Sequence, residues 1–255
     1  MESELRSYPH APTRELLLGM YARYVAALSS DESEIDRRRL EKDEAFFKFL
    51  SNRALAIARL NYALNKSTEE VQLLIWKASN YANLSLILGA KYLAEEFMSK
   101  LACGLVSRHA ELLETLKKVE VSQLVNKDVK YDELVYVVAN VYKSLSYSAS
   151  ANINDMFSQA QASLSRPNVL PYVRNRHGNL IRMFEAVFSG NRDHLLEQVK
   201  FCHEFNSKWF KHAERRNRSE SLLDLEALGV LQMARQKGLN PQSDSVYLPM
   251  PLLGN

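Results

Sequence analysis

The sequence predicts an all-α protein, and three observations support that class. Apolar residues recur at spacings of three and four in the clearest segments, which places them on one face of a helix. Glycine and proline are scarce, with 8 and 7 residues in a chain of 255, whereas an all-β protein usually places them in turns about every 8–12 residues. No segment of the sequence convincingly predicts a β-strand. We therefore predict about nine or ten helices in an irregular multi-helix bundle or an α-solenoid-like array.

The first helices are predicted from their caps. Thr13 can cap a helix that runs to about Ser29. The segment after it is charged at first and apolar later, so a loop should lead into a helix from about Ser33 to Leu64, with a break near Asp43. The run of charges in this segment is typical of a solvated face.

The next helix has the strongest start signal. Ser67 and Glu70 form a capping box, and the helix should end near Gly89. Its apolar residues surround almost the whole helix, which predicts a central, buried element. Further helices are expected over about 91–104, 106–119, 132–146 and 154–166.

The last third of the chain has clear boundaries. Pro171 begins a helix that Gly190 ends, and Asn191 or Asp193 caps the next one. The apolar residues of that second helix recur at spacings of three and four, and the last of them is Trp209.

The final helix and the tail complete the predicted fold. Ser221 and Asp224 form a second capping box, and the helix that they open should end at Gly238 as a left-handed cap. The tail, residues 239–255, contains the prolines Pro241, Pro249 and Pro251. These prolines forbid a helix, so the tail should be extended and, being apolar, should pack on the last helices. The whole chain, 1–255, is expected to form one helical domain.

Composition limits the classes of partner and compartment. The net charge of +3 is too small to indicate nucleic acid, whose ligands usually carry a strong basic stripe. Cys103 and Cys202 lie far apart, which excludes a disulfide scaffold and suits reduced thiols in the cytoplasm. No secretory signal is visible, and no apolar run reaches the ~18 residues of a membrane helix. We expect neither a nucleic acid nor a membrane as partner.

No catalytic, cofactor-binding or metal site is predicted. His194, His203 and His212 are nine residues apart, so successive ones point to opposite sides of a helix and cannot share a metal. The sequence has no GxSxG elbow, P-loop or GxGxxG motif. Cys202 lies on an apolar stripe and is interpreted as a core residue. An enzyme with an unconventional site would reveal itself by a deep polar pocket with converging titratable groups.

Two tyrosines are candidates for a protein interface. On the helix over 131–147, Leu134 and Val138 belong to the core stripe, while Tyr136 and Tyr147 fall on the opposite, polar side. Tyrosine on a polar face is typical of interfaces, because its rigid ring buries much area at low entropic cost. The alternative is that another helix or the tail covers both rings.

A basic stretch runs from Lys200 to Arg218, across the end of the predicted helix near Trp209. It includes Arg215, Arg216 and Arg218. These cations could complement a helix dipole, or they could form an electropositive rim that attracts an acidic partner. Both interpretations stay open.

The C-terminal third resembles a known family. The segment 179–253 contains the helical hairpin "LIRMFEAVFSGNRDHLLEQV", the helix end "ALGVLQMARQKGL" and the extended "DSVYLPMPLL". This layout resembles the immunity protein 49 family of bacterial polymorphic-toxin systems. The matching residues are Gly238, Leu239, Asp244, Tyr247, Leu248 and Pro249. The resemblance implies an all-helical cytoplasmic protein that binds a cognate toxin domain and blocks its active site, without catalytic residues of its own.

The leading hypothesis is therefore a toxin-neutralising immunity protein. Its expected partner-binding residues are Tyr136, Tyr147, Arg215, Arg216 and Arg218. A helical adaptor or scaffold would share the same physical features, and an α-helical enzyme with a hidden pocket is the third class. The sequence does not fix the oligomeric state.

Overall fold

The computed structural model describes residues 6–10, 12–124, 133–147, 152–216 and 218–254. Across these ranges the chain consists of α-helices, short 3₁₀ turns and loops, with no β-strand. The prediction of an all-α class is confirmed. None of the described helices combines the length and the apolar character needed to cross a membrane.

The helices follow one another with short connections. In chain order the α-helices are α1 (Arg14–Glu32), α2 (Ile35–Leu40), α3 (Glu44–Ala63), α4 (Thr68–Ile87), α5 (Ala94–Ser107), α6 (Ala110–Lys117), α7 (Glu133–Ser146), α8 (Ile153–Leu164), α9 (Pro171–Ser189), α10 (Arg192–Trp209), α11 (Ala213–Arg216) and α12 (Leu225–Gln236). The 3₁₀ turns are η1 (Val121–Leu124), η2 (Ser219–Leu222) and η3 (Met250–Leu253).

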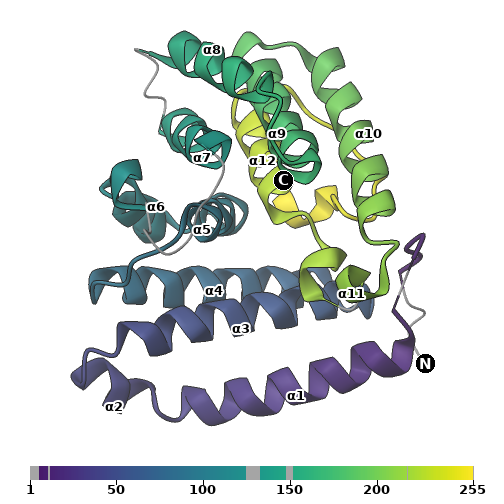
Figure 1. The fold of residues 1–255 in the computed structure, drawn as a ribbon. Helices are drawn as coiled ribbons and strands as arrows, with labels where there is room; N and C mark the ends of the chain where they lie inside the picture. Colours follow the sequence, from purple (N-terminus) through teal and green to yellow (C-terminus); the bar gives the residue numbers. More distant parts are fainter. Residues whose placement is uncertain (1–5, 11, 125–132, 148–151, 217, 255) are drawn as a thin grey trace.

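The helices are arranged in successive layers (Figure 1). α1 lies along α3, and α3 forms a long hairpin with α4. α5 packs on α4 and is also in contact with α6, α7 and α12. α8, α9 and α10 complete the side of the molecule remote from α1. α5 and α12 are thus the central elements, and an unbroken run from Leu225 to Ala234 is buried.

Several predicted helix starts are confirmed by their caps. The Thr13 side chain accepts a hydrogen bond from the Leu16 N–H at 3.3 Å. Asp43 caps α3 at the predicted break, and both hydrogen bonds of the Ser67 capping box are present. Each cap satisfies backbone donors that the first helical turn leaves without a partner.

The predicted capping box at Ser221 is wrong. Ser221 belongs to η2, and Asp224 itself caps α12 by accepting a hydrogen bond from the Ala227 N–H at 3.2 Å. The physical reason is the extended backbone of Leu223, with φ −154° and ψ 122°, which separates η2 from α12. This extended residue lets Leu222 turn away from α12 and enter a small core with Leu17 and Leu60.

The tail is extended except for one 3₁₀ turn. η3 contains Pro251, so the prediction that the prolines of the tail forbid any helix is wrong for this one turn. The turn tolerates Pro251 because a proline in the first helical turn lacks only an N–H that would have no partner there. The tail contacts α12 but also lies against earlier helices. Tyr62 of α3 donates a hydrogen bond to the Val246 carbonyl at 2.8 Å, and Gln72 of α4 donates to the Leu252 carbonyl at 3.1 Å.

Candidate functional site

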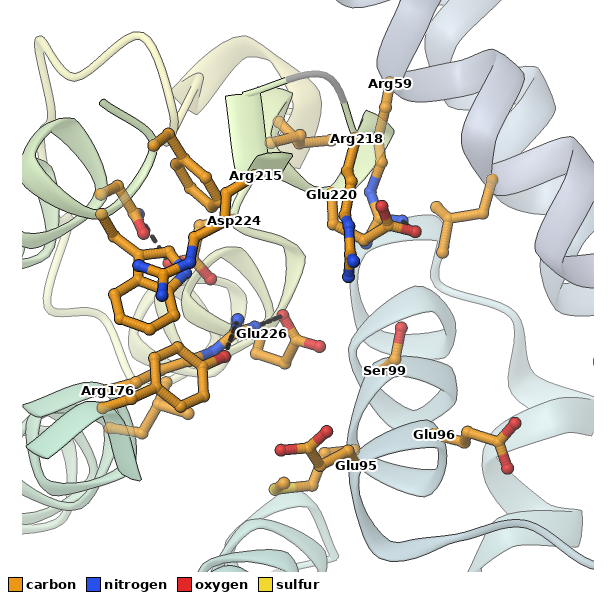
Figure 2. Close-up of a pocket in the computed structure, with 18 of the residues that line it drawn as sticks. Arg59, Glu95, Glu96, Ser99, Arg176, Arg215, Arg218, Glu220, Asp224 and Glu226 are labelled. Carbon is orange, nitrogen blue, oxygen red and sulfur yellow. Dashed lines mark hydrogen bonds and ion pairs between the residues drawn. The ribbon is translucent and has the colours of Figure 1, made fainter. Parts of the chain in front are cut away.

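A cavity of about 610 Å³ lies between the N-terminal and C-terminal helices, and we call it the central pocket. One wall comes from α3 and α5, and the other from α9, α10 and the start of α12. The segment from Phe210 to Asp224, which includes α11 and η2, runs along its edge (Figure 2). In the close-up view Arg176 and Glu226 lie together on one side of the pocket, and Arg59 and Glu220 lie together on another.

The connection between α10 and α12 explains why this pocket exists. Leu222 in η2 is 1% exposed and packs among apolar residues of α1 and α3. Burying a leucine side chain stabilises the folded state by about 1.5–3 kcal/mol. The burial of Leu222 thus holds the connection against α1 and α3 at the border of the pocket. Arg218 and Glu220 are carried by this connection and face α3 and α5 across the pocket.

Three stacked rings and an arginine form one side of the pocket. The ring of Trp209 stacks on Tyr172 with centroids 4.3 Å apart, and on Phe205 at 5.9 Å. The Arg215 guanidinium carbon lies 3.3 Å from the centroid of the Trp209 ring. Each of these four side chains is half-buried, so the stack presents aromatic edges and a cation at the surface in a fixed arrangement.

Most of the carboxylates of the pocket have a partner within the protein. Arg176 forms an ion pair with Glu226 at 2.9 Å and donates a hydrogen bond to the Tyr172 hydroxyl at 2.8 Å. Its guanidinium is therefore fixed between α9 and α12, and this pair ties the two helices together.

Three further carboxylates have partners of their own. Glu96 pairs with Lys48 at 2.8 Å, and Glu220 lies 3.7 Å from Arg59. Glu95 lies 3.6 Å from the ring of His177, which holds the pKa of the Glu95 carboxyl below its ordinary value.

Asp224 is held by neutral donors. Besides capping α12, it accepts hydrogen bonds from the Asn206 amide at 2.8 Å and from the Cys202 thiol at 3.2 Å. Burial, and next the charge of Asp224, raise the pKa of the Cys202 thiol well above its ordinary value. A protonated, buried thiol is a poor nucleophile, which agrees with the interpretation of Cys202 as a core residue.

Lys100 is a buried cation without an ion pair. It is 1% exposed and donates hydrogen bonds to Ser51 Oγ at 2.9 Å and Asn52 Oδ1 at 2.6 Å. No carboxylate of the described ranges forms an ion pair with Lys100. Burial disfavours the charged form and lowers the pKa of Lys100 to about 8.

Lys100 should make the stability of the protein depend on pH. The folded chain loses the Lys100 proton near pH 8, whereas the unfolded chain keeps it up to the ordinary pKa of 10.5. Between these values the unfolded state binds more protons, so the contribution of Lys100 to stability rises with pH, by about 2 kcal/mol from pH 7 to pH 9.5. The wild type should gain that much relative to Lys100→Met in urea unfolding at the two pH values. Replacing the exposed Lys208 by Met is the control, and an equal pH dependence of all three proteins would contradict the expectation.

Of the two candidate tyrosines, Tyr136 lies on α7 and Tyr147 directly follows it, and both are half-buried. The Tyr147 hydroxyl donates a hydrogen bond to the Leu113 carbonyl at 2.6 Å, and its ring packs against the core. Tyr136 is likewise packed against the core. Burial raises the pKa of Tyr147 above its ordinary value. Each ring therefore offers only part of its surface to a partner.

The candidate arginines lie elsewhere. Arg215 and Arg218 line the central pocket, and the side chain of Arg216 lies outside the described part of the structure. Figure 1 shows α7 and α11 well apart, so the tyrosines and the arginines do not form one surface. Within the described ranges, no three His, Cys, Asp or Glu side chains are grouped to hold a metal ion.

Comparison with known proteins identifies the family. The family model described as immunity protein 49 matches residues 25–252, which is most of the chain and much more than the C-terminal resemblance. No curated protein and no solved structure matches the chain. On the breadth of the family match, this chain belongs to the immunity protein 49 family.

Proposed function

We propose that this protein binds a cognate bacterial toxin domain in the cytoplasm and neutralises it by covering its active site. The observation that carries the proposal is the family match over residues 25–252. An immunity protein needs a surface that binds one partner tightly, and tight interfaces depend on a few rigid aromatic and arginine side chains.

The mouth of the central pocket carries rigid aromatic and arginine side chains of this kind. Tyr172, Trp209 and Arg215 are stacked together, and Arg218 is exposed on the connection between α10 and α12 that borders the pocket. Stacking fixes the rings before binding, so little side-chain entropy is lost when a partner covers them. We therefore propose the pocket mouth as the centre of the toxin interface. Tyr136 and Tyr147 stay candidates for a separate contact.

Two other classes of function are distinguished by experiment. A helical adaptor would bind a protein other than a toxin. An enzyme is the class that a polar pocket with converging titratable groups favours, and the central pocket has this character. Its Arg176–Glu226 pair and the shared hydrogen bonds of Asp224 also have a structural role, because they tie α9, α10 and α12 together.

Co-expression tests the proposal directly. The toxin domain encoded by the neighbouring gene should arrest growth when it is expressed alone, and this protein should restore growth. The Trp209→Ala variant, which removes the central ring of the stack, should restore growth poorly, whereas Phe201→Ala on the exposed side of α10 should act like the wild type. Failure of the wild type to restore growth would contradict the proposal.

The stoichiometry separates occlusion from catalysis. If the protein acts by covering the active site, the purified toxin should be inhibited fully only near one equivalent. An enzyme that modifies the toxin would inhibit it at a small fraction of an equivalent. Inhibition well below one equivalent would favour the enzyme class.

A further inference from the structure

Tyr172 connects the pocket mouth to the interior of the protein. Its ring stacks on Trp209 with centroids 4.3 Å apart, and its hydroxyl accepts a hydrogen bond from Arg176 Nη1 at 2.8 Å. The second terminal nitrogen of the same guanidinium, Nη2, donates to Glu226 Oε2 at 2.9 Å. Tyr172 and Arg176 lie four residues apart on α9, so their side chains meet on one face of the helix. One planar group thus contacts the pocket mouth and α12 at the same time.

Glu226 holds Arg176 from the buried centre of the fold. Its side chain is 12% exposed and lies in the first turn of α12. The backbone carbonyl of the same residue accepts a hydrogen bond from the fully buried Tyr142 at 3.0 Å. Figure 2 shows Arg176 and Glu226 side by side in the pocket. The position of the guanidinium is therefore set by the core of the protein.

Trp209 and Arg215 depend on their neighbours for their positions. Trp209 is the last residue of α10, and Arg215 belongs to the four-residue α11 and is stacked on Trp209. Two rings stack on Trp209 in the described part of the chain, and Phe205 belongs to the same helix whereas Tyr172 belongs to another. Tyr172 is thus the ring that holds Trp209 against the rest of the fold.

We propose that Arg176 is a positioning residue of the toxin interface. Together with Glu226 it fixes Tyr172, and Tyr172 fixes Trp209 and Arg215 before the toxin binds. The inference rests on the proposed function and adds to it a residue that acts through others. Each side chain that is ordered before binding increases the affinity by about two- to tenfold, because its conformational entropy is not lost on association.

An arginine suits this role better than a lysine. The planar guanidinium presents its nitrogens at fixed angles, so it reaches the Tyr172 hydroxyl and the Glu226 carboxylate together, whereas a lysine has one nitrogen on a flexible chain. Arg176→Lys therefore removes the geometry and keeps the charge. Tyr172→Phe removes only the hydroxyl and keeps the ring. Arg174→Lys is the matched control, because Arg174 is exposed on the same helix, donates to the Arg166 carbonyl at 2.8 Å and does not line the pocket.

Tryptophan fluorescence reports the position of Trp209 without the toxin. The chain has two tryptophans, and Trp76→Phe, on the exposed side of α4, makes Trp209 the only one. In this background Arg176→Lys and Tyr172→Phe should increase the quenching of Trp209 by acrylamide, whereas Arg174→Lys should not change it. Far-ultraviolet circular dichroism first establishes that each variant is folded. Tyr172→Phe leaves the ion pair of Arg176 intact, so it should fold even if Arg176→Lys does not.

Binding of the purified toxin domain measures the effect on the interface. We expect Arg176→Lys and Tyr172→Phe each to weaken binding by about fivefold or more, mainly by slower association, because only molecules with the stack in place bind. Arg174→Lys should change the affinity by less than about twofold. The net charge is the same in all four proteins, so the loss should persist at high salt, unlike a loss of electrostatic steering. The double variant should bind no more weakly than the weaker single variant, because both substitutions break the same contact.

The outcomes that would overturn the inference differ from those that would overturn the proposed function. Unchanged quenching of Trp209 in both variants would overturn the inference. Weaker binding without a change in quenching, or additive losses in the double variant, would show that Arg176 contacts the toxin directly and would also overturn it. Increased quenching with unchanged binding would overturn the inference and place the interface away from the pocket mouth, with the proposed function intact. Absence of binding by the wild type would overturn the proposed function and the inference with it, whatever the quenching shows.

Discussion

Deletion of residues 242–255 is expected to abolish most of the stability of the fold. Tyr247, Leu248, Leu252 and Leu253 are each at most 1% exposed. Burying side chains of this size stabilises by about 1.5–3 kcal/mol each, so the four together contribute on the order of 6–12 kcal/mol. A typical protein is stable by only about 5–15 kcal/mol, and the truncated chain should therefore be largely unfolded at 25 °C.

The tail also satisfies donors on helices far from it in sequence. Arg108, just after α5, donates a hydrogen bond to the Leu253 carbonyl at 2.8 Å, and Arg235 of α12 donates to the Gly254 carbonyl. Asp224 at the start of α12 donates its N–H to the Tyr247 carbonyl at 3.0 Å. The deletion removes these acceptors from partly buried donors and exposes the surface of α3, α4 and α12 that the tail covers.

Thermal unfolding followed by circular dichroism measures the effect. Because the deletion variant is expected to be largely unfolded, Leu248→Ala provides a graded test and should cost about 2–5 kcal/mol. Gln242→Ala, at an exposed position of the same tail, is the control and should cost less than about 0.5 kcal/mol. We propose that residues 1–255 form one domain, so the wild type should unfold in one transition. An unchanged melting temperature after the deletion would show that the packed tail contributes nothing to the stability of the fold.

Local signals explain why the helices could be predicted from the sequence. A capping side chain and its N–H partner are three residues apart, so Thr13, Asp43 and Ser67 could be identified without knowledge of the fold. The exception at Ser221 has a tertiary cause. Leu222 packs into the core formed by α1 and α3, and this contact determines where α12 begins. The spacing of residues between Ser221 and Asp224 does not reveal it.

The pocket could be predicted only in part, for a related reason. The basic stretch in the sequence indicates Arg215 and Arg218, whereas no motif in the local sequence of α5 or α9 distinguishes Lys100 or Arg176 as pocket residues. One signal was available: Lys100 stands among apolar residues, in the sequence "EEFMSKLACGLV", at a position of α5 where a core residue would be expected. What the sequence does not show is that α5, α9 and the α10–α12 connection meet around these charges.

The substitution Gly229→Ala is expected to cost about 2–6 kcal/mol, although it adds only one methyl group. A Cβ atom at this position of α12 would overlap the Tyr142 hydroxyl and would lie 3.1 Å from the Ala102 Cα atom of α5. Tyr142 is fully buried and donates a hydrogen bond to the Glu226 carbonyl at 3.0 Å. The methyl group must therefore displace a buried ring and its hydrogen bond or push α12 away from α5. Overpacking costs about 1–3 kcal/mol, and a lost buried hydrogen bond about 1–3 kcal/mol more.

A second glycine provides the matched control. Gly19 lies on the exposed side of α1, and an added Cβ atom would meet nothing within 4 Å. Gly19→Ala should therefore stabilise the protein by about 0.5–1 kcal/mol, because alanine loses less backbone entropy in a helix. Urea unfolding of the two variants measures both changes in the free energy of unfolding. If the Tyr142 hydroxyl is the obstacle, adding Tyr142→Phe should make Gly229→Ala less costly than it is in the wild type.

The same close approach of α12 to α5 also positions the central pocket. Glu226, whose carbonyl accepts the Tyr142 hydrogen bond, holds Arg176 in the pocket through its carboxylate. A methyl group at position 229 should therefore weaken toxin binding as well as stability, even in the fraction of molecules that is folded. A Gly229→Ala protein as stable as the wild type would show that α5 and α12 do not approach as closely as the structure has them, and the geometry of the pocket would then have to be revised with it.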